Sequence, residues 1–397
     1  MTILIKEGEE MRLKAIFCVI VMVALAMPAA ADEVDNHILA LNDENDTARI
    51  VAAGALGEIG DARAVDPLTY VAQNDENEDV RDAASEALEK LFYLNGDPLP
   101  SWNEGSAKNA ILSFVANVTD ESKPNYVEPE DRIATFDNDG TLWCEYPDVV
   151  QCIFLLDRVK DMAPEHPEWN DTEPFRSIVS GERCAIGDFS RDEVMQIWIA
   201  TSSNITADEY TSLARDWLDK STNSHFGLPF TACVYKPMLE LLNYLRTEGF
   251  KIYIVTGGDE DFVRAFSEEV YGIPPEQVIG TALSLQFIEN NGSTYLMRLP
   301  EFLVWTDGQE KAKEIQNDIG VRPIFAYGNC DGDIPMLQLA TGGDRRGMGL
   351  LNHHDDPIRE FEYVDYALGG GLDKGLEIAG EWGWQVVSMK DDWRYIF

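Results

Sequence analysis

The chain has 397 residues, of which 45% are hydrophobic and 10% aromatic, enough for two or three domains with well-buried cores. Its 71 acidic side chains against 31 lysines and arginines give a formal net charge of -40. Such a surface repels nucleic acid phosphates and anionic membranes, which argues against both as partners.

The N-terminus has the layout of a secretory signal peptide. Basic residues precede an apolar stretch over 15–27, and a small-residue cleavage site follows at 28–31. The apolar stretch is shorter than the about 20 residues that a membrane span needs. We therefore expect residues 1–31 to be cleaved and the mature protein to be exported, to a periplasmic-type space or outside the cell, without a membrane span. An uncleaved anchor is the alternative.

Residues 32–93 contain an internal repeat. The segment Asn42–Arg49 recurs as Asn74–Arg81, and the apolar positions that follow each copy keep helical spacing. Residues 55–68 resemble the HEAT-like repeat first noticed in phycobilisome lyases. At most two repeats fit here, fewer than the about three that a free solenoid needs, so we expect this domain to pack on the next one or on a protein partner. A structural appendage is the alternative. Residues 94–105 should form a linker.

A short buried strand, Ile133–Phe136, ends at two carboxylates, Asp137 and Asp139. Ligands bind at the carboxyl ends of strands in open α/β sheets, and Gly140 allows a tight turn there. An EF-hand loop is excluded because its glycine would have to stand two places later. A loop rich in aspartate and asparagine, without function, is the remaining alternative.

Residues 142–235 carry mostly helical signals. Two capping boxes, Ser190 with Glu193 and Thr206 with Glu209, begin helices, and no strand pattern appears before Lys251. The pattern predicts a helical insertion between two strands of one sheet, placed where it can cover Asp137.

The α/β alternation returns after residue 236. A strand over 251–256 ends at Thr256, and Gly257 and a helix start follow, an arrangement that favours phosphate binding. Residues 278–299 have hairpin character, and Lys311 stands near the start of a later helix.

A further strand, over 321–327, ends in the second acidic cluster, Gly328–Asp333. Two carboxylate groups at neighbouring strand ends provide hard oxygen ligands that suit Mg²⁺. Two separate acidic loops are the alternative.

Taken in order, these segments resemble the haloacid dehalogenase superfamily, in particular its exported, phosphoserine-phosphatase-like hydrolases with a helical C1-type cap. The resemblance covers residues 102–397. The family pattern D-x-D-G-T stands at 137–141, its threonine at Thr256, its lysine at Lys311, and its G-D-x-x-x-D at 328–333, where Asn329 replaces the first acid.

The resemblance implies an α/β fold with a doubly wound parallel sheet. A Rossmann-like core would comprise residues 106–141 and 236–397, the cap 142–235, and a small helical repeat domain 32–93.

For function, the resemblance implies a Mg²⁺-dependent phosphoric monoester hydrolase acting on small phosphomonoesters. Asp137 would form an aspartyl-phosphate and Asp139 would carry the proton; because halide leaves without a proton, Asp139 favours phosphoryl transfer over dehalogenation. The implied sites are Asp137, Asp139, Thr256 and Lys311 in catalysis, Thr141 and Gly257 at the phosphate, and Asp137, Asp139, Asn329, Asp331 and Asp333 at the metal.

Several alternatives stay open at this point. Asn329 or Asp331 completes the metal site. A catalytically quiet scaffold that recruits a partner through its HEAT-like domain, or a phosphotransferase, would carry the same sequence. His353 and His354 are interpreted as structural or surface residues.

Overall fold

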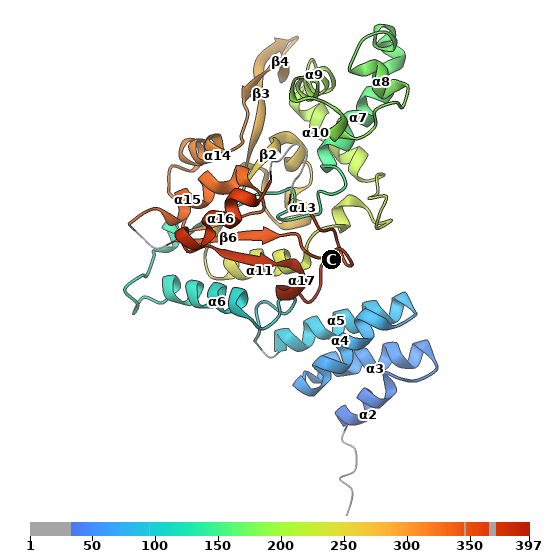
Figure 1. Ribbon diagram of the computed structural model, residues 1–397, viewed down its shortest axis with the longest axis vertical. Coiled ribbons are helices and arrows are strands. Elements are labelled where there is room, and N and C mark those ends of the chain that lie inside the picture. Colours follow the sequence, from blue (N-terminus) through green and yellow to red (C-terminus); the bar gives the residue numbers. More distant parts are fainter. Residues whose placement is uncertain (1–32, 95, 345–346, 365–370) are drawn as a thin grey trace, which may run out of the picture. The chain divides into compact units, whose positions relative to one another are not determined.

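The computed structural model describes residues 33–94, 96–344, 347–364 and 371–397 (Figure 1). It divides into two compact units, Met1–Pro100 and Ser101–Phe397. The expected signal peptide, residues 1–31, lies outside the described residues. Within them, no helix is both long and apolar enough to traverse a bilayer.

The first unit is built from the repeated helices. Its helices are α2 (Glu33–Ala40), α3 (Asp46–Ile59), α4 (Val65–Asn74) and α5 (Glu78–Leu94). Equivalent side chains of the two copies make equivalent contacts: Arg49 donates to the Asp43 carbonyl at 2.9 Å, and Arg81 donates to the Asp75 carbonyl at 2.8 Å. The repeat is therefore visible in the hydrogen bonds as well as in the sequence.

The second unit contains a seven-stranded sheet of order β4-β3-β2-β1-β5-β6-β7. Only the β3–β4 pair among these strands is antiparallel. The strands are β1 (Ile133–Phe136), β2 (Lys251–Asp259), β3 (Val278–Asn290), β4 (Ser293–Val304), β5 (Phe325–Gly328), β6 (Met348–His353) and β7 (Gln385–Ser388).

Helices cover both faces of this sheet (Figure 1). On one face, Val255, Ala326 and Leu351 pack with apolar residues of α15 and α16. On the other, Phe114 of α6 meets Phe325 at 6.2 Å between ring centroids. The doubly wound α/β prediction is confirmed. These helices are α6 (Ser106–Thr119), α11 (Lys236–Thr247), α12 (Glu260–Arg264), α13 (Ser267–Tyr271), α14 (Gln309–Glu314), α15 (Ile334–Thr341), α16 (Asp373–Trp382) and α17 (Met389–Asp392).

The register of the central strands explains where the site lies. Phe136 at the end of β1 is paired with Ile254 of β2 and Tyr327 of β5. The residues that follow these three positions therefore emerge at the same edge of the sheet. The strand expected over 321–327 begins only at Phe325, because Pro323 has no N–H to donate to a neighbouring strand.

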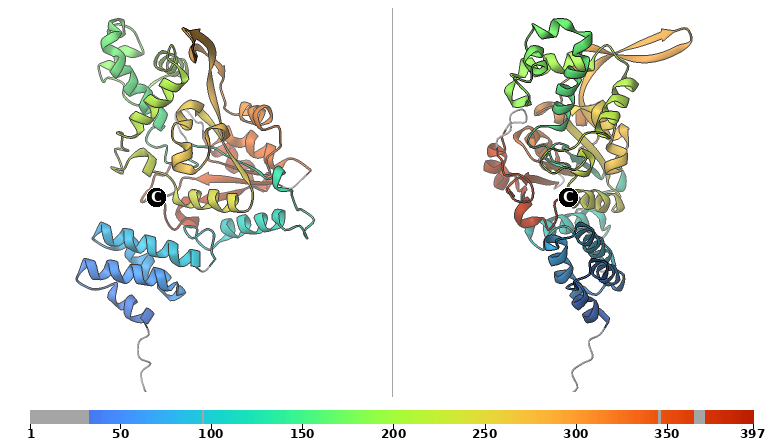
Figure 2. Two further views of the ribbon diagram at one scale, coloured as in Figure 1. Left: turned by 180° about the vertical axis from the view of Figure 1, so that it is seen from behind. Right: turned by 90° about the vertical axis from the view of Figure 1, so that its right-hand side faces the viewer.

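Between β1 and β2 the chain runs through the helices α7 (Val150–Met162), α8 (Phe175–Val179), α9 (Arg191–Ser202) and α10 (Ala207–Leu218). Both expected capping boxes are present, at Ser190 and Thr206. These helices gather into one group beside the β3–β4 hairpin (Figure 2). We call this group the cap.

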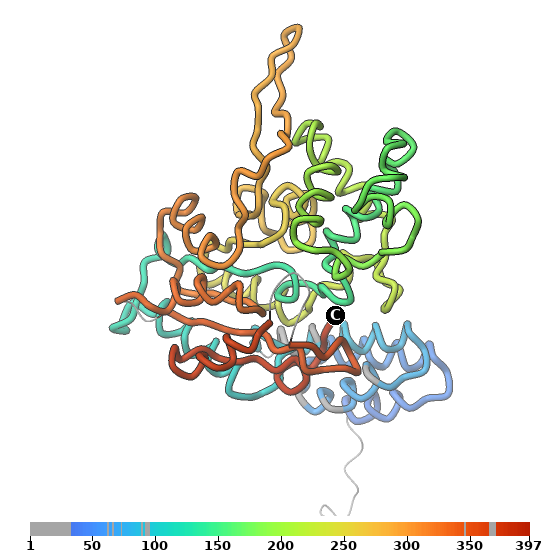
Figure 3. The backbone as a smooth tube through the Cα atoms, turned by 45° about the horizontal axis from the view of Figure 1, so that its top comes forward, coloured from blue at the N-terminus to red at the C-terminus, as the bar shows by residue number. Residues whose placement is uncertain are grey.

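The β3–β4 hairpin is longer than the expected segment and projects beyond the sheet (Figure 3). Its turn uses Asn291 and Gly292 at positive φ, as tight hairpins require. Arg298 on β4 is buried and forms ion pairs with Asp259 and Asp261. Its backbone also bonds to that of Ile205 in the cap, at 2.9 Å. The hairpin thus ties the cap to the end of β2.

Candidate active site

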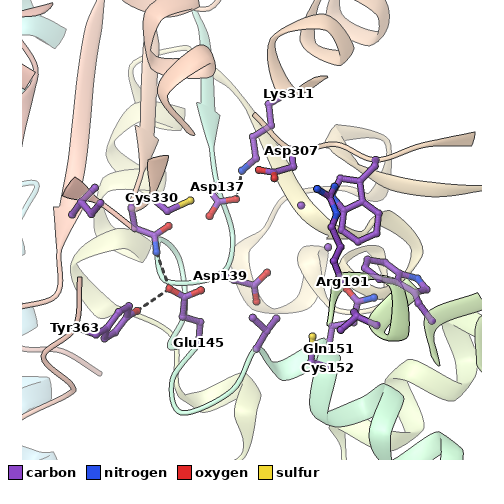
Figure 4. Close-up of a pocket in the computed structure, with 18 of the residues that line it drawn as sticks. Asp137, Asp139, Glu145, Gln151, Cys152, Arg191, Asp307, Lys311, Cys330 and Tyr363 are labelled. Carbon is purple, nitrogen blue, oxygen red and sulfur yellow. Dashed lines mark hydrogen bonds and ion pairs between the residues drawn. The ribbon is translucent and has the colours of Figure 1, made fainter. Parts of the chain in front are cut away.

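The nucleophile candidate, Asp137, lies directly after β1 and forms a buried ion-paired group (Figure 4). Lys311 Nζ lies 2.6 Å from Asp137 Oδ1 and 2.7 Å from Asp333 Oδ1. The three residues come from β1, α14 and the turn after β5, so the fold brings together groups that are 174 and 22 residues apart. Lys311 is therefore held between the two acidic clusters.

The electrostatics of this group favour a charged lysine. Burial alone would lower the pKa of Lys311, but Asp137 and Asp333 outweigh it and hold that pKa well above its ordinary value. Burial and the nearby Asp333 raise the pKa of Asp137, and Lys311 opposes them. The pKa of Asp139 is raised by burial, against a hydrogen bond of 2.9 Å from Trp143 Nε1. A raised pKa suits a residue that must donate a proton.

Gly140 forms the turn between Asp139 and the cap. Its φ of +71° favours glycine, and an added Cβ would lie 2.0 Å from Asn329 Nδ2. Its carbonyl accepts hydrogen bonds from Asn352 Nδ2 at 3.1 Å and from His354 Nε2 at 2.8 Å. His354 is buried, and its other ring nitrogen lies 3.2 Å from Glu360, which agrees with a structural role.

Asn329 joins the two acidic clusters through hydrogen bonds. Its Oδ1 accepts from Thr141 Oγ1 at 3.1 Å, and its Nδ2 donates to Glu145 Oε1 at 2.9 Å. Tyr363 donates a second hydrogen bond to Glu145, at 2.8 Å. Burial, followed by the charge of Asp139, raises the pKa of Glu145 well above its ordinary value.

Sequence reasoning missed both Glu145 and Tyr363. Glu145 had one available signal: it is a carboxylate that ends the apolar run 142–144, eight residues after Asp137. Tyr363 had none, since its segment carries no recognisable pattern.

The phosphate-binding candidates lie at the end of β2. Thr256 is buried, and its Oγ1 accepts from Gly258 N–H at 3.0 Å. Gly257 and Gly258 line the same cavity as Asp137 and Asp139. A Cβ on Gly258 would lie 2.8 Å from Gln151 Oε1, so the backbone there approaches the cap closely.

The two acids of the second cluster have different surroundings. Asp333 Oδ2 accepts from the backbone N–H groups of Asn329 and Cys330, at 2.9 and 3.1 Å, and thus shapes the loop as well as holding Lys311. The carboxylate of Asp331 instead accepts from the N–H groups of Lys374 and Gly375, at 3.3 and 2.7 Å. Asp331 as a metal ligand therefore stays a prediction; in the structure its carboxylate engages the N–H groups at the start of α16.

The remaining donors fit a hard divalent cation. Asp137, Asp139 and Glu145 line one cavity, and Lys311 is the only cation that pairs with Asp137 among the residues described. Mg²⁺ keeps several waters and needs few carboxylates, so Asp137, Asp139 and the Asn329 carbonyl are a suitable set. Over the described ranges, no three His, Cys, Asp or Glu side chains form a ready-made metal cage.

These residues line a cavity of about 260 Å³ between the sheet edge and the cap. The cap supplies a largely apolar wall. The lining residues from the cap segment are Val149, Gln151, Cys152, Phe189, Arg191, Val194 and Trp198.

Two family models match the chain. That of haloacid dehalogenase-like hydrolases matches residues 134–338, and that of HEAT repeats matches residues 21–99. The resemblances to the haloacid dehalogenase superfamily and to HEAT repeats are thereby confirmed. No curated protein matches the chain in sequence.

Solved structures similar to the chain include a protein of unknown function from Anaerococcus prevotii, with 17% identity, a TM-score of 0.48 and coverage of 72% of this chain and 92% of that one. A phosphoserine phosphohydrolase-like protein from Francisella tularensis has 17% identity, a TM-score of 0.33 and coverage of 56% and 88%. A probable phosphoserine phosphatase from Vibrio cholerae has 14% identity, a TM-score of 0.33 and coverage of 70% and 73%.

Proposed function

Since the chain belongs to the haloacid dehalogenase-like hydrolases, whose family model matches slightly more than half of it, we propose that it hydrolyses small phosphomonoesters through an aspartyl-phosphate. The observation that carries the proposal is the contact of Lys311 with both Asp137 and Asp333 beside the cavity, with Asp139 lining the same cavity. A nucleophilic carboxylate needs this kind of pairing with a cation to approach an anionic phosphate.

In the first step an oxygen of Asp137 attacks phosphorus while the bond to the leaving oxygen breaks. Asp139 gives its proton to that oxygen, and the alcohol departs. In the second step Asp139 takes a proton from water, the water oxygen attacks phosphorus, and the bond to Asp137 breaks to release inorganic phosphate. The side chain of Thr256 and the backbone of Gly257 would orient the phosphoryl oxygens, with Lys311 offsetting their charge.

Asp137, Asp139 and Asn329 would hold Mg²⁺, which would neutralise negative charge on the phosphoryl group in this site. The cap wall would exclude bulk water while the ester is bound.

The test is turnover of p-nitrophenyl phosphate by the mature protein, with Mg²⁺ or with EDTA, and by Asp137→Asn. We expect EDTA and the substitution each to lower turnover by at least about 10³-fold, the scale of losing a nucleophile or its charge stabilisation. Asp331→Asn separates the two ligand assignments: a loss comparable to that of EDTA would place its carboxylate at the metal, and full activity would leave that role to Asn329. Activity that survives EDTA or Asp137→Asn would contradict the mechanism.

The same assay separates hydrolysis from phosphotransfer. With glycerol present, a hydrolase releases nitrophenol and inorganic phosphate in equal amounts, whereas a phosphotransferase releases less phosphate. We further propose that residues 1–31 direct export, which fractionation of cells that produce the full chain would test. A quiet scaffold is disfavoured by the intact ion pairs of Lys311.

A further inference from the structure

Arg191, the first residue of α9, is an exposed cation of the cap. It lines the cavity from the cap, and Figure 4 shows it across the cavity from Asp137. The structure gives it no ion pair or hydrogen bond with any residue of the described ranges. By contrast, two other cap arginines are paired: Arg183 with Glu193 at 2.7 Å and Arg176 with Glu182 at 3.1 Å.

The contact that the structure does give Arg191 is aromatic. Its guanidinium carbon lies 5.0 Å from the ring centroid of Trp305, within the range of a cation–π interaction. Asp307, two residues after Trp305, also lines the cavity. Among the described residues no ion pair joins this acid to Arg191. The guanidinium therefore keeps its hydrogen-bond donors available at the mouth of the cavity.

Trp305 belongs to a fixed aromatic wall. Its ring centroid lies 5.4 Å from that of Trp198, and Trp198 Nε1 donates to Asp259 at 3.0 Å. Asp259 is itself buried and paired with Arg298. The indole of Trp198 is thus anchored to the end of β2, where the phosphate-binding candidates lie. The two indoles, whose planes differ by 57°, form an apolar surface that is tied to the end of β2.

We propose, resting on the proposed function, that the substrate is the phosphate ester of an aromatic acid. The ring of the leaving alcohol packs against Trp198 and Trp305, and its anionic substituent pairs with Arg191. An aromatic ring gains burial on this wall, and a planar guanidinium binds a carboxylate through two parallel hydrogen bonds. A cavity of about 150 Å³ accepts one benzene, so the cavity of about 260 Å³ has room for one ring with its two substituents.

Four esters test separately whether the site prefers an aromatic ring and whether it prefers an anionic substituent. They are 4-carboxyphenyl phosphate, phenyl phosphate, 3-phosphoglycerate and glycerol phosphate. We expect kcat/KM for the carboxylated aryl ester to exceed that for phenyl phosphate at least tenfold. Arg191→Gln should bring this ratio close to one, and Arg191→Lys should restore part of it because the charge returns. Trp305→Leu should lower kcat/KM for both aryl esters more than for glycerol phosphate.

The matched control is Arg176→Gln, which removes an exposed cap arginine that is already ion-paired and does not line the cavity. It should leave the ratio unchanged. If Arg191→Gln lowers kcat/KM equally for the carboxylated and the plain aryl ester, Arg191 acts on the transferred phosphate, and the inference is overturned. A wild-type protein with no preference for the carboxylated aryl ester would also overturn it.

A binding arm separates this inference from the proposed function. If no ester releases phosphate, the proposed function fails, and binding is then measured through intrinsic tryptophan fluorescence in Asp137→Asn. At least tenfold tighter binding of 4-carboxyphenyl phosphate than of phenyl phosphate, lost on adding Arg191→Gln, supports the inference. Equal affinities overturn it.

Discussion

Asn329 donates a hydrogen bond of 2.9 Å from its side-chain amide to Oε1 of Glu145, and both residues are buried. The family pattern has an acid in the place of Asn329. A carboxylate there would lack the N–H that donates to Glu145, and the two carboxyl groups would have to share a proton or repel each other. The neutral amide is therefore the residue type that suits a neighbouring glutamate at this position.

Replacing this amide tests the relationship. Asn329→Asp should destabilise the metal-free protein by about 1–3 kcal/mol, because it removes a donor from a buried acceptor and adds a second carboxyl group. With Mg²⁺ the same variant should need a lower metal concentration for half-maximal activity, because it offers one more anionic ligand. Urea unfolding in EDTA and a Mg²⁺ titration of turnover measure the two effects.

The double variant Asn329→Asp with Glu145→Gln is the control, because the glutamine amide can donate the hydrogen bond in the reverse direction. It should recover much of the lost stability. Unchanged stability of the single variant in EDTA would show that the bond between these side chains contributes little.

Lys311→Met should leave Asp137 and Asp333 buried without their cation. Breaking a buried pair by removing one partner costs about 3–5 kcal/mol, part of which protonation of the aspartates relieves. Turnover should also fall by at least about 10²-fold, because the cation that balances the nucleophile and the phosphate is lost. Urea unfolding at pH 7 and steady-state kinetics measure these losses.

Lys313→Met is the matched control for this variant, since Lys313 stands on the same helix and is 59% exposed. It should change stability by less than about 0.5 kcal/mol, as surface substitutions usually do. A comparable loss in both variants would assign the effect to α14 and not to the ion pairs.

The sequence predicted the parts of the site that local patterns mark. Asp137 follows one buried strand and Thr256 lies near the end of another. The carboxyl ends of neighbouring parallel strands meet at one edge, so the proximity of these residues follows from the sheet alone. Lys311 could be placed only through the family resemblance, because nothing local distinguishes it from a surface lysine. Its contact with Asp137 depends on how α14 packs.

The features that sequence reasoning missed or left open depend on contacts between distant segments. The Glu145–Tyr363 hydrogen bond joins residues 218 positions apart. Asp331 resembles a ligand by its spacing, but the start of α16, more than 40 residues later, competes for its carboxylate. Arg298 gave no signal in a hairpin pattern, although its ion pairs connect β4 to the end of β2.

Gly140→Ala should damage both stability and activity. The left-handed φ of +71° is strained for alanine, at about 1–2 kcal/mol, and the new methyl group would meet Asn329 and Glu145. Gly181→Ala is a matched control in the cap, with φ +73° and no atom within 4 Å of the added Cβ. This variant should lose only the unfolding free energy that the left-handed backbone costs an alanine. Equal losses of unfolding free energy in the two variants would contradict the predicted steric contact.

Asp148 should make stability fall with rising pH. Burial raises its pKa to about 6 from 3.8, although the N–H of Ile186 donates to its carboxylate at 3.1 Å. Between these two values the folded protein keeps a proton that the unfolded chain has released, so this contribution to stability is complete below pH 3.8 and is lost as pH rises through about 6. In Asp148→Asn the amide side chain does not titrate, and its oxygen can still accept the hydrogen bond from the N–H of Ile186.

The quantity to measure is the unfolding free energy of the wild type minus that of Asp148→Asn, from urea unfolding at pH values from 4 to 8. The difference should decline across the window from pH 4 to about 6 and level off above it, because no further proton is then released by the folded state. Asp161→Asn, which removes an exposed carboxylate from the last turn of α7, is the control for the loss of one carboxylate. A difference for Asp148→Asn that rises with pH would mean that the folded state stabilises the charged carboxylate, and the direction of its pKa shift would be the reverse.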